Sequence, residues 1–192
     1  CCGGRETLDD ACRNKGIDVE QFLVRMEELS VEAGTAAPFW SLTELIDHIV
    51  SAHHVFLRSE LPRLSNLTRK VLTAHGDKDP RFLSLREMFL KLSDELTQHM
   101  LKEEQVLFPI IKKMEKTASV PEFHGGSISD PIRQMESEHD QAGFALNALR
   151  ELTDEYLVPD GACNTQKVML ASLVDLEKDL HQHIHKENNM LF

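Results

Sequence analysis

The chain has 192 residues, of which 41% are hydrophobic and 28% charged, and its formal net charge is −11. This length allows one sizeable hydrophobic core and a small additional module. The negative charge argues against nucleic acid and anionic membrane surfaces as partners. Because no apolar run approaches the ~20 residues of a membrane span, we also expect no insertion into a membrane.

Four cysteines are too few for a secreted disulfide framework, and no signal peptide is visible, so we expect a cytoplasmic protein. Two of them, Cys1 and Cys2, precede a pair of glycines in "CCGG". The sequence starts without methionine and stops at Phe192 inside a helical pattern. We therefore expect the natural chain to continue at one or both ends.

Residues 1–31 predict a small helical module, with candidate helices at Asp9–Lys15 and Asp18–Leu29 on either side of Gly16. The stretch "EAGTAAP" (32–38) predicts a linker. A second domain is expected over 39–192, because four long helical segments separated by Gly- and Pro-containing breaks follow. They cover residues 41–64, 80–116, 127–156 and 164–192.

Apolar residues recur at spacings of three and four along three of these segments, and His and Glu occupy the same stripe. In the second segment the stripe is Leu85, Phe89, Leu92, Leu96, His99, Glu103, Val106 and Ile110. In the third it is Ile128, Ile132, Met135, His139, Ala142, Leu146 and Leu149, and in the fourth Met169, Leu173, Leu176, Leu180, His183, Glu187 and Met190. Such stripes form the inward faces of a helical bundle, so we predict an all-α antiparallel four-helix bundle.

The first long segment carries two overlapping stripes. One contains His53, in Leu42, Ile46, Ile49, His53 and Phe56, and the other contains His54, in His54, Leu57, Leu61 and Leu64. Periodicity leaves open which of the two histidines faces the core.

The chain contains an internal repeat. "ELTQHMLKEEQVLF" (95–108) and "DLHQHIHKENNMLF" (179–192) are identical at seven of fourteen positions, and both contain His-x-x-x-Glu. The sequence is therefore two helical hairpins of similar plan. Each hairpin has one stripe histidine in its first helix and the His-x-x-x-Glu pair in its second.

A single histidine on an apolar face is usually a hydrogen-bonded core residue, but two buried carboxylates are costly unless they are compensated. No Lys or Arg occupies the stripes of the second to fourth segments. Four histidines and two glutamates, without thiolate, suit iron, manganese or zinc and exceed the needs of one tetrahedral zinc. We expect two iron ions bridged by Glu103 and Glu187, with di-manganese or a mixed-metal pair as the alternative. Without a metal, burial and mutual repulsion should raise the pKa of both carboxylates.

The remaining histidines match no stripe at this level and are expected on the surface or in loops. They are His48, His75, His124, His181 and His185.

The motifs "HMLKEEQVLFP", "MESEHDQAG" and "HIHKENNMLF", behind "CCGG", resemble the bacterial iron–sulfur cluster repair di-iron proteins. These are hemerythrin-like proteins with a small Cys-Cys-Gly-Gly domain. The resemblance covers nearly the whole chain and implies an oxo- and carboxylate-bridged pair of iron ions. The ligands that it implies are His54, His99, Glu103, His139, His183 and Glu187.

The resemblance further implies that the protein repairs iron–sulfur clusters damaged by nitric oxide or oxidative stress, through iron delivery, nitric oxide turnover or both. Its partners would be damaged iron–sulfur proteins and, as small ligands, nitric oxide or oxygen. Cys1 and Cys2 would act as redox thiols. A hemerythrin-like sensor or carrier of oxygen or nitric oxide is the alternative, although a gas carrier needs no thiols. Enzymatic reduction of nitric oxide and formation of a homodimer remain open.

Overall fold

The computed structural model describes residues 7–33, 40–117 and 128–192, and the chain divides into two compact units. The smaller unit contains α1 (Leu8–Lys15) and α2 (Val19–Ala33), and the larger one spans Ser41–Phe192. Helix α2 continues past its predicted end at Leu29. Cys1, Cys2 and most of the predicted linker lie outside the described residues.

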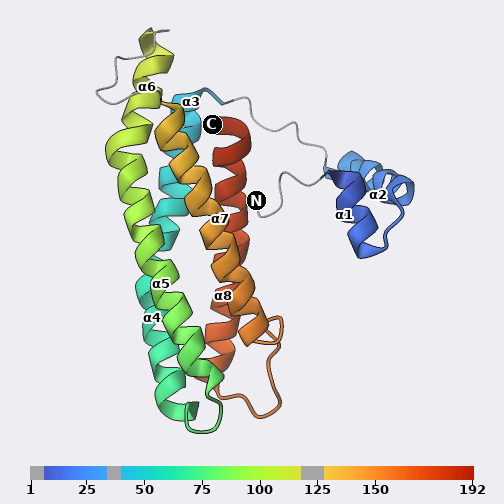
Figure 1. The fold of residues 1–192 in the computed structure, drawn as a ribbon, viewed down its shortest axis with the longest axis vertical. Coiled ribbons are helices and arrows are strands. Elements are labelled where there is room, and N and C mark those ends of the chain that lie inside the picture. The colour runs from blue at the N-terminus through green and yellow to red at the C-terminus, as the bar shows by residue number, and fades with distance from the viewer. Residues whose placement is uncertain (1–6, 34–39, 118–127) are drawn as a thin grey trace. The chain divides into compact units, whose positions relative to one another are not determined.

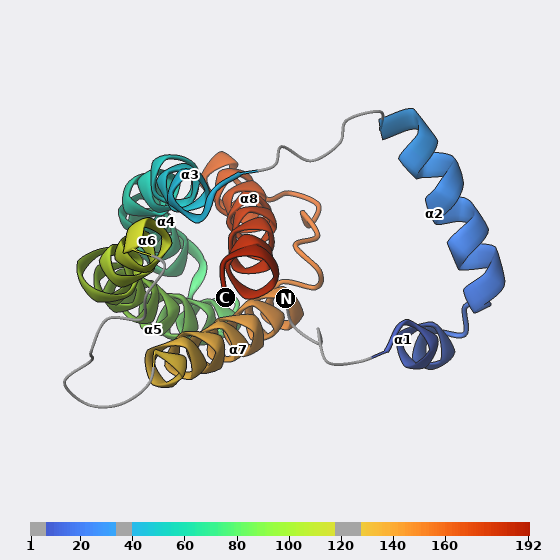
Figure 2. The same cartoon turned by 90° about the horizontal axis from the view of Figure 1, so that it is seen from above.

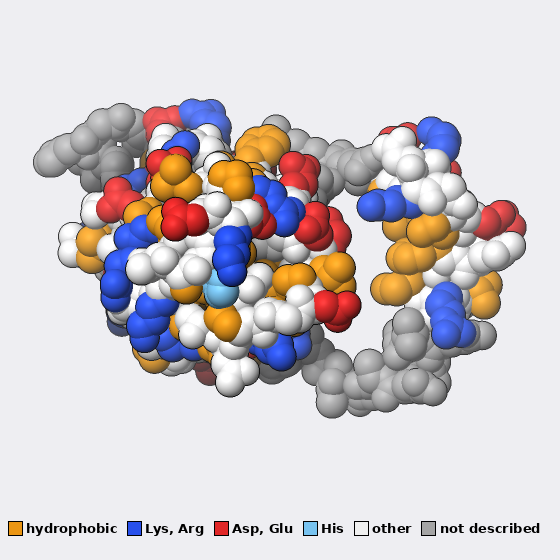
Figure 3. Space-filling view, turned by 90° about the horizontal axis from the view of Figure 1, so that it is seen from below, with side chains coloured by type: hydrophobic (Ala, Val, Ile, Leu, Met, Phe, Trp, Pro, Cys, Tyr) orange, Lys and Arg blue, Asp and Glu red, His pale blue; other side chains and the backbone are white. Residues whose placement is uncertain are grey.

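Both ends of α1 follow from local sequence. The side chain of Thr7 accepts a hydrogen bond from the backbone of Asp10, and Gly16 ends the helix with a φ of 66°. Glycine adopts this left-handed conformation without steric cost, which explains the break between α1 and α2. On this unit, hydrophobic side chains that include Leu23 and Val24 are exposed (Figure 3).

The larger unit is a four-helix bundle, so the predicted all-α fold is confirmed (Figure 1). Three of its four rods contain a π-helical turn. The first rod consists of α3 (Leu42–His48), η1 (Ile49–His54) and α4 (Val55–His75), and the second of α5 (Arg81–Lys102), η2 (Glu103–Leu107) and α6 (Phe108–Thr117). The third is α7 (Ser129–Leu152), and the fourth is α8 (Asn164–Lys186) followed by η3 (Glu187–Leu191). Helix α5 packs against α4 and α7, and α4 packs against α8 (Figure 2).

The first rod continues to His75 instead of ending at Leu64, so that prediction was too short. Its inward stripe runs on through Thr68 and Val71, which are 1% exposed. Threonine fits this buried position because its hydroxyl donates a hydrogen bond to the carbonyl oxygen of Ser65. The buried face of this rod therefore continues through a polar residue, Thr68, which the apolar pattern did not identify.

The π-helical turns shift the inward face by one residue. The regular stripe predicts that Val106 and Met190 face the core, but they are 45% and 42% exposed. Their successors Leu107 and Leu191 are buried instead, at 2% and 8%. Because a π turn contains one extra residue, every later side chain moves around the helix axis. The two predictions at Val106 and Met190 were therefore wrong.

The same effect explains the two overlapping stripes of the first rod. Ile46, Ile49 and His53 belong to the inward stripe that enters η1, and His54, the last residue of η1, begins the inward stripe that continues with Leu57. The π turn joins the two stripes, so both histidines are buried, at 3% and 0% exposure.

No helix in the described part of the chain is long and apolar enough to cross a membrane. At the end of the bundle that carries the α4–α5 turn, acidic, basic and hydrophobic side chains are interspersed (Figure 3). Neither sign of charge dominates this face.

Candidate metal centre

The structure brings the six predicted ligand residues together in the interior of the bundle. They form two overlapping groups in which one possible ligand atom per residue lies within 4.8 Å of the others. One group is His54, Glu103, His183 and Glu187, and the other is His99, Glu103, His139 and Glu187. We call these the His54–His183 half and the His99–His139 half. The two glutamates belong to both.

Glu103 lies between the two halves. Its Oε2 is 3.4 Å from Nε2 of His54 and 3.4 Å from Nε2 of His99. Within each half the two imidazoles also meet through Nε2, at 3.2 Å between His54 and His183 and at 3.1 Å between His99 and His139. All four Nε2 atoms thus converge on one small volume.

Glu187 connects the halves with its two oxygens. Oε1 lies 2.8 Å from Nε2 of His183, and Oε2 lies 3.0 Å from Nε2 of His139. A carboxylate that offers one oxygen to each half has the arrangement required of a bridging ligand.

Three of the four histidines are also held from outside the cluster through Nδ1. The contacts are His54 to Glu104 at 2.6 Å, His99 to Glu138 at 3.0 Å and His139 to Asn188 at 2.8 Å. An Nδ1–H that donates to such an oxygen leaves the Nε2 lone pair directed into the cluster. This is the tautomer that a metal ligand needs.

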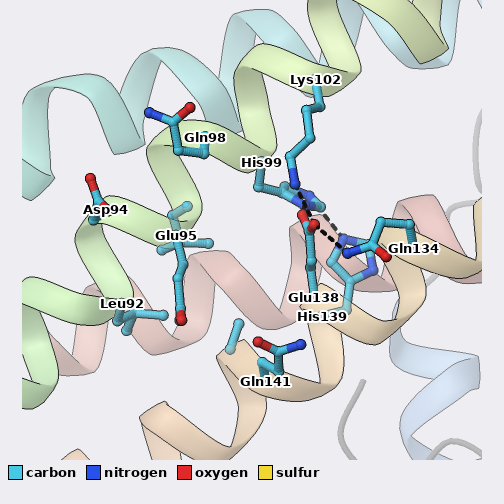
Figure 4. Close-up of a pocket in the computed structure, with 12 residues that line it drawn as sticks. Leu92, Asp94, Glu95, Gln98, His99, Lys102, Gln134, Glu138, His139 and Gln141 are labelled. Atoms are coloured by element: carbon cyan, nitrogen blue, oxygen red, sulfur yellow. Dashed lines mark hydrogen bonds and ion pairs between the residues drawn. The ribbon is translucent and has the colours of Figure 1, made fainter. Parts of the chain in front are cut away.

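The two outer carboxylates are themselves fixed by cations. Arg58 donates to Glu104 at 2.6 Å, and Glu138 accepts from Lys102 and, at 2.8 Å, from Gln134 (Figure 4). The hydrogen bond from His99 outweighs burial and lowers the pKa of Glu138 to about 2, so this group stays ionised and accepts.

The cluster residues are deeply buried, with Glu103 and Glu187 both 0% exposed. Neither carboxylate pairs with a Lys or Arg among the described residues. There, Oε1 of Glu103 has no hydrogen-bond partner, and Oε2 of Glu103 and Oε2 of Glu187 meet only Nε2 atoms of the cluster histidines. Buried carboxylate oxygens without partners are costly, so the cluster needs positive charge.

In the absence of a metal, protons on His54 and His99 supply positive charge, because the pKa of both imidazoles is raised. Burial opposes protonation of His99, but hydrogen bonds to Glu103 and Glu138 outweigh it and raise its pKa to about 10. Burial likewise raises the pKa of Glu187, yet the charge of His183 and the hydrogen bond from His139 bring it well below the ordinary value. The prediction of a raised pKa is therefore wrong for Glu187. That prediction took into account burial and the repulsion between the two carboxylates, but not the neighbouring histidines.

The donor set fits two cations. Four imidazole nitrogens and two carboxylates, without thiolate, match the preferences of iron, manganese and zinc. Of the cysteines that the structure describes, Cys12 lies in α1 of the smaller unit, and Cys163 caps α8 and contacts His75 at 3.1 Å. Neither belongs to the groups that could hold a metal.

A cavity of about 200 Å³ lies between α5 and α7, beside the His99–His139 half (Figure 4). Its lining includes both histidines of that half together with the polar residues Glu95, Glu138 and Gln141. It provides a space in which a small molecule can approach this half of the cluster.

The other histidines differ in part from expectation. His53 is buried, and its Nδ1 lies 2.8 Å from Oδ1 of Asp179. His48 packs edge-on against His53 with ring centroids 5.8 Å apart. His185 is exposed as predicted, and His124 lies outside the described residues.

The outer partners Glu104, Glu138 and Asn188 were missed in the sequence. A usable signal was present, because each of them directly neighbours a stripe residue. A polar residue next to a buried ligand on the same helix can reach a histidine of the adjacent helix.

Comparison with known proteins places this site in a family. Residues 45–192 match the model of the hemerythrin HHE cation-binding domain. The whole chain is 38% identical to the iron–sulfur cluster repair protein YtfE of Dickeya chrysanthemi and covers 84% of that protein's length. The chain belongs to this family of hemerythrin-domain repair proteins. The YtfE proteins of Yersinia pseudotuberculosis and Yersinia pestis are 37% and 36% identical to it, over the same shares of both chains.

Membership in the hemerythrin family agrees with the geometry. The matched region begins at Leu45 in the first rod and runs through the last, so it includes all six cluster residues. The family's cation-binding domain and the buried His/Glu cluster coincide in the same bundle.

Proposed function

We propose that this protein repairs damaged iron–sulfur clusters in other proteins, using two iron ions held by the six residues of the cluster. The similarity to the YtfE repair proteins over the entire chain supports the repair function. The buried carboxylates Glu103 and Glu187, which contact histidine Nε2 atoms but no Lys or Arg among the described residues, support a pair of cations. This last observation carries the proposal, because without metal ions the two buried carboxylates depend on protonated histidines alone for positive charge.

In this proposal His54 and His183 would hold one ion and His99 and His139 the other, and Glu103 and Glu187, which belong to both groups, would contribute to both. When bound, the two ions supply one-electron redox chemistry, positions for nitric oxide or oxygen, and iron that can be given up to a client. The protein's own residues orient the site: Glu104, Glu138 and Asn188 fix imidazole rings through Nδ1. The surrounding bundle excludes water from the carboxylates.

Cys1 and Cys2 are proposed as redox thiols that supply electrons to the iron site or to a damaged client. The pair lies outside the described residues, and the argument for it rests on the "CCGG" motif alone. We propose that the protein acts under nitrosative and oxidative stress, because nitric oxide and oxidants would then damage the iron–sulfur clusters of its client proteins.

The proposal is tested by metal analysis followed by repair of a client protein. We expect about two iron ions per chain, and we expect iron-loaded protein to restore a nitric oxide-damaged iron–sulfur enzyme. Glu187→Ala should lose iron and repair together, whereas Asn189→Ala at an exposed neighbouring position should keep both. One tightly bound zinc with no uptake of iron would contradict the proposal.

A second function, binding of oxygen or nitric oxide as a sensor or carrier, has one observation in its favour. The cavity beside His99 and His139 can admit a small ligand. Exposure of the reduced protein to nitric oxide separates the two functions. A stable adduct without repair of a client would favour the carrier, and repair would favour the main proposal.

A further inference from the structure

The two hairpins of the repeat place equivalent residues around the two halves of the cluster. Aligning the repeats matches Lys102 with Lys186 and Glu104 with Asn188. Glu104 and Asn188 play the same structural role, because each contacts Nδ1 of a cluster histidine: Glu104 that of His54, and Asn188 that of His139. The outer contacts thus follow an approximate two-fold symmetry.

This symmetry is broken at one position. Aligning His54 with His139 matches His53 with Glu138, since each directly precedes the stripe histidine. Glu138 accepts a hydrogen bond from Nδ1 of His99. His53, at the equivalent position, offers no such acceptor to His183.

His53 contacts His183 in a different way. The two rings stack with centroids 5.2 Å apart and planes at 5° to one another. Both nitrogens of His53 are already used, since Nδ1 lies 2.8 Å from Asp179 and Nε2 lies 2.7 Å from Nζ of Lys186. Lys186 therefore holds His53 as Lys102 holds Glu138.

As a consequence, His183 is the one cluster histidine without an outer partner for Nδ1 among the described residues. The residue is 1% exposed, so bulk water does not replace that partner. Stacking restrains the tilt of the ring, but it does not draw on the Nδ1 proton. A histidine that lacks an outer acceptor is a less basic and less firmly oriented ligand, and loss of such a partner typically lowers metal affinity about 10–100-fold.

We propose that the two halves bind their cations with unequal affinity, that the His54–His183 half is the weaker, and that the exchange of Glu138 for His53 at the symmetric position causes the difference. This rests on the proposed function and deepens it, because it names the ion that is given up first. His53 is a positioning residue in this scheme and touches the cation site only through the ring of His183.

The described cavity and the proposed weaker metal affinity fall on different halves of the cluster. The cavity borders the His99–His139 half, whose histidines are both anchored from outside. The lining of this cavity includes neither His54 nor His183. The experiment must therefore measure equilibrium affinity, because rates of metal loss also depend on access.

Protein loaded with two Fe(II) under anaerobic conditions is equilibrated with increasing concentrations of a coloured Fe(II) chelator. We expect two steps separated by about tenfold or more in affinity. Anomalous diffraction from crystals of the half-depleted protein should locate the remaining iron between His99 and His139. A single step, or remaining iron between His54 and His183, would overturn the inference.

Two reciprocal variants test the cause. His53→Glu, combined with Asp179→Asn to remove the like charge that it would face, should strengthen the weak half and bring the two steps together. Glu138→His should weaken the strong half and also bring the steps together, but at the lower affinity. The inference is wrong if both folded variants keep the two steps of the parent.

These outcomes are distinct from failure of the proposed function. A pair of equally bound ions in a protein that still repairs clusters would refute only the unequal affinity. Absence of a bound pair would refute the proposed function itself.

Discussion

The π-helical turn η2 can be tested by comparing alanine substitutions at two neighbouring residues. Leu107 is 2% exposed, whereas Val106 is 45% exposed. Leu107→Ala removes three buried carbon atoms at about 0.8 kcal/mol each, and the cavity adds to this loss. We expect a decrease of about 2–5 kcal/mol in the free energy of unfolding. Val106→Ala should change it by less than about 0.5 kcal/mol, since the side chain is largely in water and alanine favours the helix.

The assay is urea unfolding followed by circular dichroism, at one fixed protein and metal concentration because bound metal adds its own stabilisation. Leu191→Ala and Met190→Ala form the matching pair in the second repeat, with the same expected order. Equal effects at Val106 and Leu107, or a larger effect at Val106, would refute the shift. The helix would then continue as a regular α-helix beyond Glu103.

Four further predictions concern the cluster and the thiols. Glu104→Ala removes the acceptor for Nδ1 of His54 and should lower Fe(II) affinity about 10–100-fold in equilibrium chelator competition, while Gln105→Ala at the exposed neighbouring position leaves it unchanged. Removal of the metal should lower the melting temperature in calorimetry, because the metal binds the folded state only; equal melting temperatures would refute a buried site. In metal-free protein the pKa of His99 is about 10, above its ordinary 6.5, so its contribution to stability is complete below about pH 6.5 and lost as the pH rises toward 10. Urea unfolding at pH 7 and pH 10 should therefore show lower stability at pH 10, and an unchanged midpoint would contradict the pKa. Replacing both Cys1 and Cys2 by serine should leave iron content intact but reduce repair driven by thiol reductants, and full repair would exclude the thiols from the mechanism.

Several features of this protein follow from the sequence alone because they depend on contacts within one helix. The spacing of three and four residues identified the inward faces, and the repeated His-x-x-x-Glu placed His99 with Glu103 and His183 with Glu187 on such faces. Side chains four residues apart share a face of any α-helix, so this prediction needed no tertiary information. The breaks at Gly and Pro likewise separated the rods.

Tertiary structure decided where the helical period changes. A π turn is unfavourable in an isolated helix and persists where packing on both sides of it requires the shift. Periodicity therefore did not predict that Leu107 replaces Val106 in the core, and it left His53 and His54 as alternatives where the structure buries both.

Tertiary structure also decided which residues hold the cluster from outside. Glu104 reaches His54 from another rod, and Glu138 reaches His99 in the same way. These contacts join residues 50 and 39 positions apart, respectively, and depend on how neighbouring rods are rotated and offset. Periodicity within one helix carries no information about that offset, so the unequal support of the two halves became visible only in the folded bundle.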